Sequence, residues 1–439
     1  MLGGDETTTI NRVTTAPTRS PIDVAIVGGG AAGLATAIFA ARRMPGRAIV
    51  VLDGAKKLGA KILVAGGGRC NVTNRLVTAA DFCGGSRNFV KRVLAAHPSA
   101  DTVSFFREIG VELVAEEHGK LFPTTNRAQT VLDALLAEAN RLGVSIRPAH
   151  RVNDIHPSDG AFQIEAGGTT ICARHVVLAT GGQSLPKTGS DGVGFGFARA
   201  LGHTLVPVTP ALAPLVLEGG FHTPLSGVAH DVELTVSAAH VKDVRLCGAL
   251  LWTHFGVSGP VVLDASRHWH RARAEGRDVE VSLNFLPGRD FAAAERMLLD
   301  LTAAAPNTRL QRALGRYLPA RVAQAILENL AIDGSTSMAH LRKDQRRVLV
   351  HGLLTWPLPV RDSRGYAYAE ATAGGVSLSE IDPSSMASRK CTGLFLVGEI
   401  LDVDGRIGGF NFQWAWSSAW VAARGVSGAG TSQPEQEAN

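Results

Sequence analysis

IDVAIVGGGAAGLATAIFAARR, residues 22–43, is the stretch of sequence that decides the fold. It begins with a short apolar, β-branched run, continues through a cluster of glycines, and ends in an alanine-rich segment from Ala31 to Arg43. This order predicts a strand, a tight turn and a helix. A second apolar run at 48–52 completes a βαβ unit, so we expect an α/β fold with a parallel sheet.

The glycine cluster fits the pattern G-x-G-x-x-G. Gly28 allows a sharp turn, Gly30 leaves bare backbone against which a pyrophosphate can lie, and Gly33 lets helix and strand pack closely. The free N–H groups at the helix start, around Ala31 and Ala32, face the phosphates. Asp53 follows Gly33 by twenty residues at the end of the second run, where a carboxylate can accept hydrogen bonds from ribose hydroxyls. The pattern predicts a dinucleotide whose first nucleotide carries no 2′-phosphate.

Composition limits the remaining classes of protein. Hydrophobic residues make up 45% and charged residues 19% of 439, which excludes a disordered chain, a coiled coil and a collagen-like repeat. Lys and Arg number 44 against 39 Asp and Glu, a basic balance that permits an anionic partner without requiring one. Five cysteines without a C-x-x-C pair argue against a disulfide framework or a cysteine zinc site, so we expect a cytoplasmic protein. No secretory signal or membrane anchor is expected.

Changes of pattern along the chain predict its domains. Alternating stretches near 231–237 and 278–284 precede helix-rich sequence at 291–354, after which glycine-rich turns and apolar runs return. We therefore expect a discontinuous nucleotide-binding domain with an insertion. The expected boundaries are a disordered segment 1–20, the nucleotide-binding domain at 21–203 plus 366–425, an inserted β domain at 204–290, an inserted helical part at 291–365, and a loose tail at 426–439.

A second motif, Ala65-Gly-Gly-Gly-Arg-Cys-Asn-Val-Thr-Asn74, combines bare backbone with hydrogen-bond donors. Here the sequence closely resembles the BaiN-like or aminoacetone-oxidase-like NAD(P)/FAD-dependent oxidoreductases of bacteria. The resemblance continues through five further motifs in order. They are ATGG at 179–182, PKTGS at 186–190, THFGVSGP at 253–260, AGGV at 373–376 and the run GEILDVDGRIGGFNFQWA at 398–415.

The resemblance implies a Rossmann-like, two-dinucleotide-binding-type flavoprotein fold with an inserted β-barrel and helical cap. It also implies bound FAD, with NAD(P)H as a transient electron donor. Carried over by position, Glu399 binds the ribityl chain, and the helix that opens near Asn411 and Phe412 directs N–H groups towards the flavin pyrimidine. The implied cofactor-binding residues are Gly28, Gly30, Ala31, Ala32, Gly33, Asp53, Lys61, Gly67, Gly68, Arg69, Cys70, Asn71, Thr180, Gly181, Gly398, Glu399, Asp402, Gly409, Asn411 and Phe412.

Several residues have competing interpretations. Cys70 is a packed thiol or a redox group, and the absence of a nearby second cysteine favours packing. His254 is a structural histidine or a proton donor beside the flavin. The cluster His268–Arg271 is expected to be a solvated helix rather than a metal site, and no metal site is expected elsewhere. The run Gly192–Gly196 resembles the first fingerprint but departs from it at the last position, so a second nucleotide site has weak support.

Three functions stay open on this sequence. The first is an FAD-dependent oxidoreductase that moves hydride between flavin and a small organic molecule. The second is a flavin-dependent reductase of a uridine in ribosomal RNA, for which the basic runs at 267–277 and 342–347 offer anion-binding surface, although an exposed charged helix is the simpler explanation. The third is an amine oxidase-like enzyme or a non-catalytic flavin-binding protein. The sequence does not define an oligomeric state.

Overall fold

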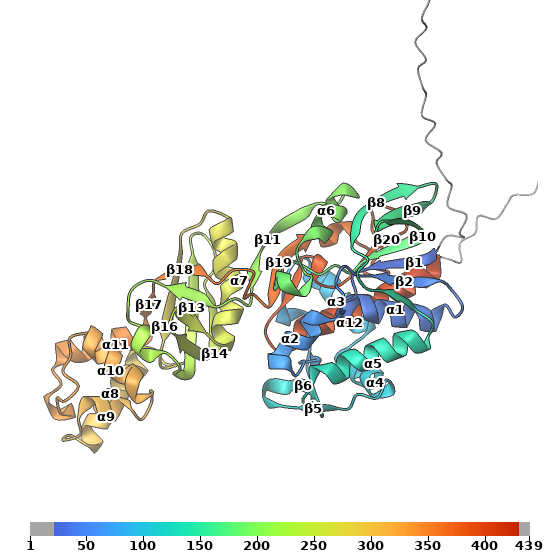
Figure 1. Ribbon diagram of the computed structural model, residues 1–439. Helices are drawn as coiled ribbons and strands as arrows, with labels where there is room; N and C mark the ends of the chain where they lie inside the picture. The colour runs from blue at the N-terminus through green and yellow to red at the C-terminus, as the bar shows by residue number, and fades with distance from the viewer. Residues whose placement is uncertain (1–21, 430–439) are drawn as a thin grey trace, which may run out of the picture.

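A parallel sheet forms the centre of the larger part of the molecule (Figure 1). The computed structural model describes residues 22–429. The strand order is β7-β2-β1-β10-β9-β8, and β20 also pairs with β10. Pairing is parallel from β7 to β10 and at β20, whereas β9 and β8 form an antiparallel extension. The strands are β1 (Ile22–Val27), β2 (Ile49–Leu52), β7 (Ser145–Arg147), β8 (Val152–Ser158), β9 (Ala161–Ala166), β10 (Thr169–Leu178) and β20 (Leu394–Leu396). The predicted βαβ unit is confirmed.

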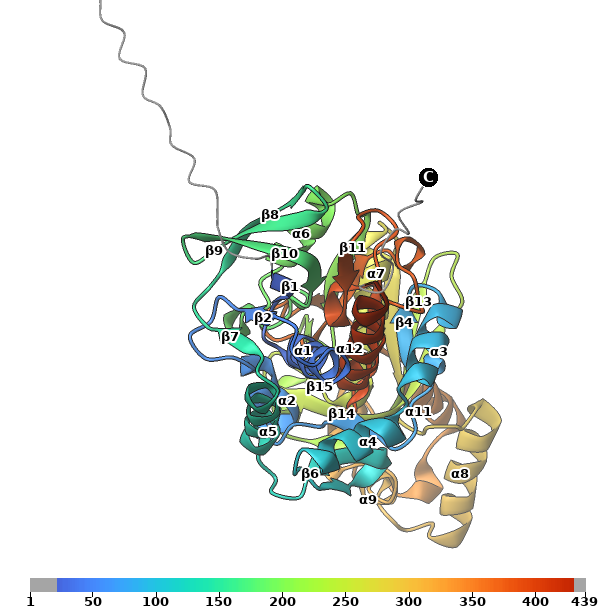
Figure 2. The same ribbon diagram turned by 90° about the vertical axis from the view of Figure 1, so that its right-hand side faces the viewer.

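Helices and short strands surround this sheet. The longest helix, α12 (Phe410–Ala429), lies beside α1 (Ala31–Arg43) at the centre of Figure 2. Five of the ten buried residues of α1 are alanine and one is glycine, so the two helices approach closely, and two tryptophans of α12, Trp414 and Trp416, are almost fully buried. The other elements of this region are α2 (Ala60–Gly68), β3 (Thr73–Asn74), β4 (Phe82–Gly84), α3 (Arg87–Ala96), α4 (Ser99–Glu108), β5 (Leu113–Ala115), β6 (Lys120–Pro123), α5 (Ala128–Arg141), α6 (Val193–Ala200), β11 (Leu205–Ala211), β19 (Ala371–Val376), η7 (Gly398–Ile400) and β21 (Val403–Gly405).

A second, antiparallel sheet lies between β11 and β19 in the sequence. Its order is β17-β16-β13-β14-β15-β12-β18, and Pro359 alone separates β17 from β18 along the chain. The two edge strands of this sheet are therefore consecutive in the chain, and the expected closure into a barrel stays a prediction. The strands are β12 (Leu215–Leu217), β13 (Ala229–Ala238), β14 (Val244–Thr253), β15 (Gly256–Ser258), β16 (Val279–Asn284), β17 (Trp356–Leu358) and β18 (Val360–Ser363).

Five helices accompany this sheet. Helix α7 (Pro260–Ala274) packs between the sheet and β11, and the helices at the far end of the molecule in Figure 1 are α8 (Phe291–Ala304), α9 (Leu310–Leu314), α10 (Ala320–Asn329) and α11 (Lys343–Leu354). No helix of residues 22–429 is both long and apolar enough to cross a membrane.

The buried side chains form two large clusters. One draws on residues 24–201 together with 376–426, and the other on residues 215–358. The residue-level domain boundaries stay a prediction. One correction concerns the expected tail, because α12 continues to Ala429 and Val426 is buried. The rest of that tail and the expected disordered segment 1–20 lie outside the described residues.

Candidate functional site

The first glycine turn joins β1 to α1, and its three fingerprint glycines meet different surroundings. A side chain at Gly28, which has a φ of +107°, would collide with the carbonyl of Ala179 at the end of β10. One at Gly33 would collide with the carbonyl of Gly28, so strand and helix are in direct contact here. A Cβ at Gly30 would meet no atom within 4 Å. Gly28 and Gly33 therefore serve packing, and Gly30 leaves the helix start open to a phosphate.

Asp53 at the end of β2 points towards this turn. Its Oδ2 accepts a hydrogen bond of 2.6 Å from the Gly29 N–H, and its Oδ1 accepts one of 2.7 Å from the Ala55 N–H. Each carboxylate oxygen has a further lone pair that can accept a ribose hydroxyl. The structure therefore brings the predicted acid and the predicted glycine turn together, with the carboxylate already oriented by the backbone.

A polar network lies near the end of β20. The Lys61 ammonium is 2.5 Å from Glu399 Oε2 and 2.6 Å from Ser184 Oγ, and Ser184 Oγ donates to Glu399 Oε1 over 2.8 Å. The Thr372 N–H donates to the same Oε1, and the Thr372 hydroxyl accepts from the N–H groups of residues 183 and 184. The Lys61 and Glu399 side chains keep 28% and 17% of their surface exposed, so the network borders solvent. Sequence reasoning found Lys61 and Glu399 but missed Ser184 and Thr372.

Gly398 links this network to the two central helices. A Cβ at Gly398 would lie 2.9 Å from the Cβ of Ala32 in the first turn of α1. Its N–H donates to Ser418 Oγ and its carbonyl accepts from the Trp414 indole, both in α12. The starts of α1 and of η7 therefore lie against each other, with α12 bonded to both ends of the Gly398 peptide.

Glycines directly precede the start of α12, as they do the start of α1. Gly408 and Gly409 have φ values of +130° and +92°, and a side chain at Gly409 would meet the carbonyl of Thr73 at 2.6 Å and Asn71 Oδ1 at 2.9 Å. Asn74 donates to the carbonyl of Gly408 over 3.1 Å. Asn71 Oδ1 is buried and has no hydrogen-bond partner. A buried acceptor without a donor suggests that a ligand completes this site.

The side chains of Asn411 and Phe412 are both bound within the protein. The Asn411 side chain makes a pair of hydrogen bonds with the backbone N–H and carbonyl of Gly405, at 2.8 and 2.9 Å. Phe412 stacks on Trp416 with the ring centres 5.7 Å apart. Only the backbone N–H groups of this first turn are left to face a ligand, since the first N–H groups of any helix have no partner within it.

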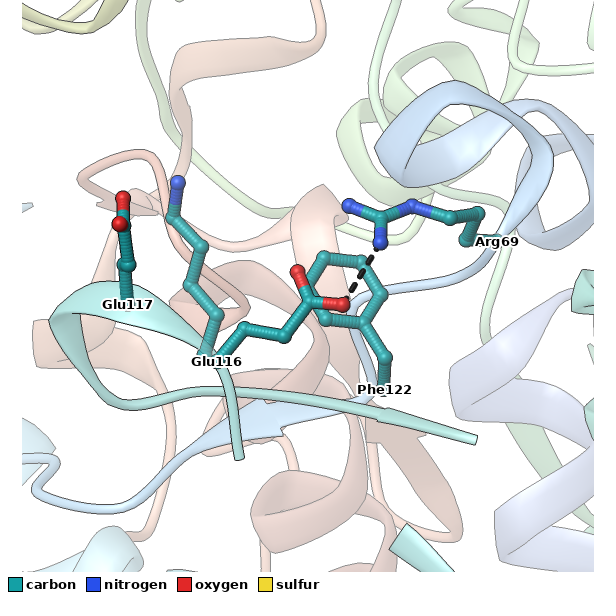
Figure 3. Close-up of a pocket in the computed structure, with 5 residues that line it drawn as sticks. Arg69, Glu116, Glu117 and Phe122 are labelled. Atoms are coloured by element: carbon teal, nitrogen blue, oxygen red, sulfur yellow. Dashed lines mark hydrogen bonds and ion pairs between the residues drawn. The ribbon is translucent and has the colours of Figure 1, made fainter. Parts of the chain in front are cut away.

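The glycine-rich loop at 65–68 is bent, as its composition suggests. Gly66, Gly67 and Gly68 all have positive φ values, and no atom lies within 4 Å of a Cβ at Gly67. Two of the predicted residues, Gly67 and Gly68, are thus exposed backbone. Arg69, by contrast, directs its guanidinium to Glu116 at 2.7 Å and over the ring of Phe122 at 4.1 Å (Figure 3). It lines a cavity of about 350 Å³ with these two residues, Glu117 and Lys120.

Cys70 is fully buried in the first core, and its φ is +61°. Burial raises the pKa of its thiol to about 12. Because the thiolate is the reactive form of cysteine, this side chain is a packing group and not a nucleophile.

Thr180 and Gly181 follow β10 directly. Thr180 Oγ1 is buried without a hydrogen-bond partner, and so is the hydroxyl of Ser190, which lies close to Gly181. A side chain at Gly194 would collide with that of Thr180. The glycine run at 192–196 therefore allows α6 to pack closely against the end of β10.

Asp402 and Asp404 are two acidic residues that precede Gly408 and Gly409 in the chain. Burial raises the pKa of Asp402 to about 6, and its Oδ1 has no hydrogen-bond partner. Asp404 is 2.7 Å from the buried guanidinium of Arg267, which also donates to the carbonyls of Asp404 and Gly405. Sequence reasoning missed this contact, because Arg267 was read only as part of a basic run.

The cluster His268–Arg271 is less exposed than expected. It lies on α7 with Trp269 buried, and burial lowers the pKa of both His268 and His270 to about 4. The expectation of a solvated helix is therefore wrong, because α7 packs between two sheets. His254, in contrast, is exposed at the turn between β14 and β15, with the edge of its ring against Phe255.

The parts that a dinucleotide needs are present together. The turn at Gly30 is open and the carboxylate of Asp53 is oriented towards it, as a pyrophosphate and a ribose require, and the buried oxygens Asn71 Oδ1 and Thr180 Oγ1 have no hydrogen-bond partner. The fold and this site define a Rossmann-type flavoprotein.

The particular family follows from sequence comparison. Residues 22–425 match the model of the HI0933-like protein Rossmann domain, and the chain belongs to this family. It is an FAD-dependent oxidoreductase.

Two curated relatives are similar over nearly their whole length. The 3-dehydro-bile acid delta(4,6)-reductase of Clostridium scindens is 32% identical over 92% of this chain and 98% of its own. The ribosomal RNA dihydrouridine synthase of Escherichia coli is 33% identical over 93% of this chain and 99% of its own. Among solved structures, E. coli quinol fumarate reductase FrdA has a TM-score of 0.49 and 19% identity over 95% of this chain and 72% of that chain.

Proposed function

We propose that the protein is an NAD(P)H-dependent reductase that saturates a carbon–carbon double bond in a ring. The observation that carries this proposal is the chemistry common to the two relatives. A delta(4,6)-reductase acts on ring double bonds, and dihydrouridine is uridine with its ring double bond saturated. Both names therefore describe the addition of two hydrogens across C=C, although one substrate is a steroid and the other an RNA base.

The residues that would hold FAD come from the N-terminal and the C-terminal segments of the larger part. Gly30 and the start of α1 would face the pyrophosphate, Asp53 the ribose, and Glu399 the ribityl chain, while the start of α12 would face the pyrimidine edge. FAD bound there would supply the hydride for the double bond, with NAD(P)H as the electron donor. The Lys61 ammonium, 2.5 Å from Glu399 Oε2, holds the Glu399 carboxylate in place.

The proton that completes the addition needs a donor, and His254 is our candidate. Its imidazole is exposed, so it can be protonated again from water. The thiol of Cys70 is a poor donor for this step, because it is fully buried and burial raises its pKa to about 12, so it holds its proton. A His254→Ala variant should bind FAD as the wild type does and turn over more slowly. Full turnover by that variant would remove the catalytic role.

Anaerobic reduction tests the proposal directly. The purified protein should show flavin absorbance, which NADH or NADPH should bleach. The colour should then return when an acceptor with a conjugated ring double bond is added, such as a cyclic enone or a uridine-containing RNA. An uncoloured protein that also refuses added FAD contradicts the cofactor assignment. Reoxidation by oxygen alone, with no acceptor from this panel, contradicts the reductase assignment.

A uridine in ribosomal RNA is the second candidate substrate. The observation that favours it is the distribution of charge, because residues 301–350 contain eight Lys and Arg against three Asp and Glu. A small neutral substrate has no use for such a surface, whereas RNA binding depends on it.

A further inference from the structure

We propose that the helices α8–α11 form a docking surface for the phosphate backbone of a structured RNA, from which a target base reaches the flavin-binding part of the same chain. This inference rests on the proposed function and names its substrate class. It begins with the net charge. The whole chain has a surplus of five basic residues, and residues 291–354, which span α8–α11, account for a surplus of four, with nine Lys and Arg against five Asp and Glu. The rest of the chain is therefore nearly balanced.

Almost all of this charge is at the surface. Seven of the eight basic side chains of residues 301–350 are exposed, and only Arg346 is partly buried, where it meets Glu295 at 3.3 Å. The exposed ones are Arg309, Arg312, Arg316, Arg321, Arg342, Lys343 and Arg347.

The exposed cations also lack acidic partners. Among the residues that the structure describes, Arg342 is the only one of the seven with an ion pair, to Asp344 at 3.2 Å. Both of these side chains are 70% exposed, so the pair contributes little. In the nucleotide-binding part, Arg42 and Arg151 each meet a carboxylate at 3.0 Å or less, whereas the exposed Arg87, Lys91 and Arg92 of α3 have no ion pair within residues 22–429. A surface of unpaired cations repels itself and attracts a polyanion.

An exposed aromatic ring lies within this basic surface. Tyr317, between α9 and α10, is 44% exposed, and the Arg289 guanidinium lies over it at 5.7 Å from the ring centre. Arg312 and Arg316 precede Tyr317 in the same short segment. Arginines around an exposed ring are the combination on which unpaired bases stack, so the surface suits RNA with unpaired segments.

The location of the helices fits a large substrate. They form one end of the molecule, and the antiparallel sheet separates them from β1 and α1 (Figure 1). A small molecule at the glycine turns would not touch them. A folded RNA can span the distance, so that phosphates are held at one end while one base is presented at the other.

The test uses the holoenzyme and purified bacterial ribosomal RNA as the probe. The triple variant Arg312→Gln/Arg316→Gln/Arg347→Gln removes three unpaired cations from the docking surface. The matched control, Arg87→Gln/Lys91→Gln/Arg92→Gln, removes three exposed cations from α3. Affinity is measured by filter binding between 50 and 300 mM salt. We expect the docking variant to lose at least tenfold in affinity, and its slope of log K against log salt to fall by about 2.

Three outcomes overturn the inference. They are unchanged RNA affinity in the docking variant, an equal loss in the α3 control, and preferential binding to vesicles of anionic lipid that competes with RNA. The proposed function fails separately, because NAD(P)H bleaching and reoxidation by a small cyclic enone involve no RNA. Both triple variants should keep the flavin content and the bleaching rate of the wild type.

Discussion

Arg267 of α7 and Asp404 of β21 form a buried ion pair, with 2.7 Å between the guanidinium Nη1 and the carboxylate Oδ2 and at most 5% of either side chain exposed. The same guanidinium donates to the carbonyls of Asp404 and Gly405. A carboxylate of the same helix, Asp264, accepts from the Ile407 N–H at 2.7 Å. One helix outside the nucleotide-binding sheet thus fixes the loop that leads into α12.

Removing one member of this pair should lower the stability of the protein strongly. Arg267→Met leaves the carboxylate of Asp404 buried without its cation, and we expect a loss of about 3 to 5 kcal/mol in the free energy of unfolding. Urea unfolding measures this loss. The double variant Arg267→Met/Asp404→Leu removes both charges and should recover most of it. If the double variant is as unstable as the single one, the backbone hydrogen bonds of Arg267 are the larger contribution.

The glycine turn allows a test that separates binding from folding. Gly30→Val adds a side chain where no atom lies within 4 Å, at a φ of −83° that valine accepts. We expect its urea midpoint to stay near that of the wild type while the FAD dissociation constant, measured by flavin fluorescence, rises at least tenfold.

Gly33→Ala is the matched comparison for this variant. Its methyl group would collide with the carbonyl of Gly28, so it should lower stability as well as FAD binding. Unchanged FAD affinity in Gly30→Val would show that the pyrophosphate does not lie against this turn.

Variants of Lys61, which contacts Glu399, test the ribityl end of the expected cofactor site. Lys61→Met removes the cation 2.5 Å from the Glu399 carboxylate and leaves Ser184 and Thr372 as its partners. We expect FAD affinity to fall several-fold because the carboxylate is less well held, and Lys61→Arg to restore part of it. Ser104→Ala on α4, which removes an exposed hydroxyl, serves as the control. Equal affinity in Lys61→Met and the wild type would separate Glu399 from the cofactor.

Local patterns predicted the nucleotide-binding unit well. The predicted strand at 22–27 and helix at 31–43 agree with β1 and α1, because the glycine turn and the apolar runs act within thirty residues. The pairing of Asp53 with the turn followed from the same unit.

Such local patterns did not predict the long-range contacts. Arg267 and Asp404 are 137 residues apart, and nothing in the basic run around Arg267 marks it as buried. Arg69 stays a predicted cofactor-binding residue, but its motif does not reveal that its guanidinium is held by Glu116 and Phe122 from another hairpin. The two histidines of α7 were expected in solvent because local periodicity does not reveal that both sides of that helix are covered.

Asp402 makes stability depend on pH in a direction opposite to that of most carboxylates. Its pKa is about 6 in the folded protein because of burial, and about 3.9 in an unfolded chain. Between these values the folded state binds the proton more tightly, so the stability that the neutral carboxyl gives is complete below about pH 4 and is lost as pH rises through 6. Asp402→Asn stays neutral throughout and should be more stable than the wild type at pH 7.5, by about 1 to 3 kcal/mol.

Urea unfolding at pH 4, 5, 6 and 7.5 measures this effect as the difference between variant and wild type, so that other titrating groups cancel. His97 is one such group, because burial lowers its pKa to about 4, and its contribution is lost as pH falls. Asp133→Asn, which removes one exposed carboxylate, controls for the change in net charge. The difference for Asp402→Asn should grow from pH 4 to pH 7.5. A variant less stable than the wild type at pH 7.5 would mean that the ionised carboxylate is held by a partner such as Arg271, whose charge opposes the effect of burial.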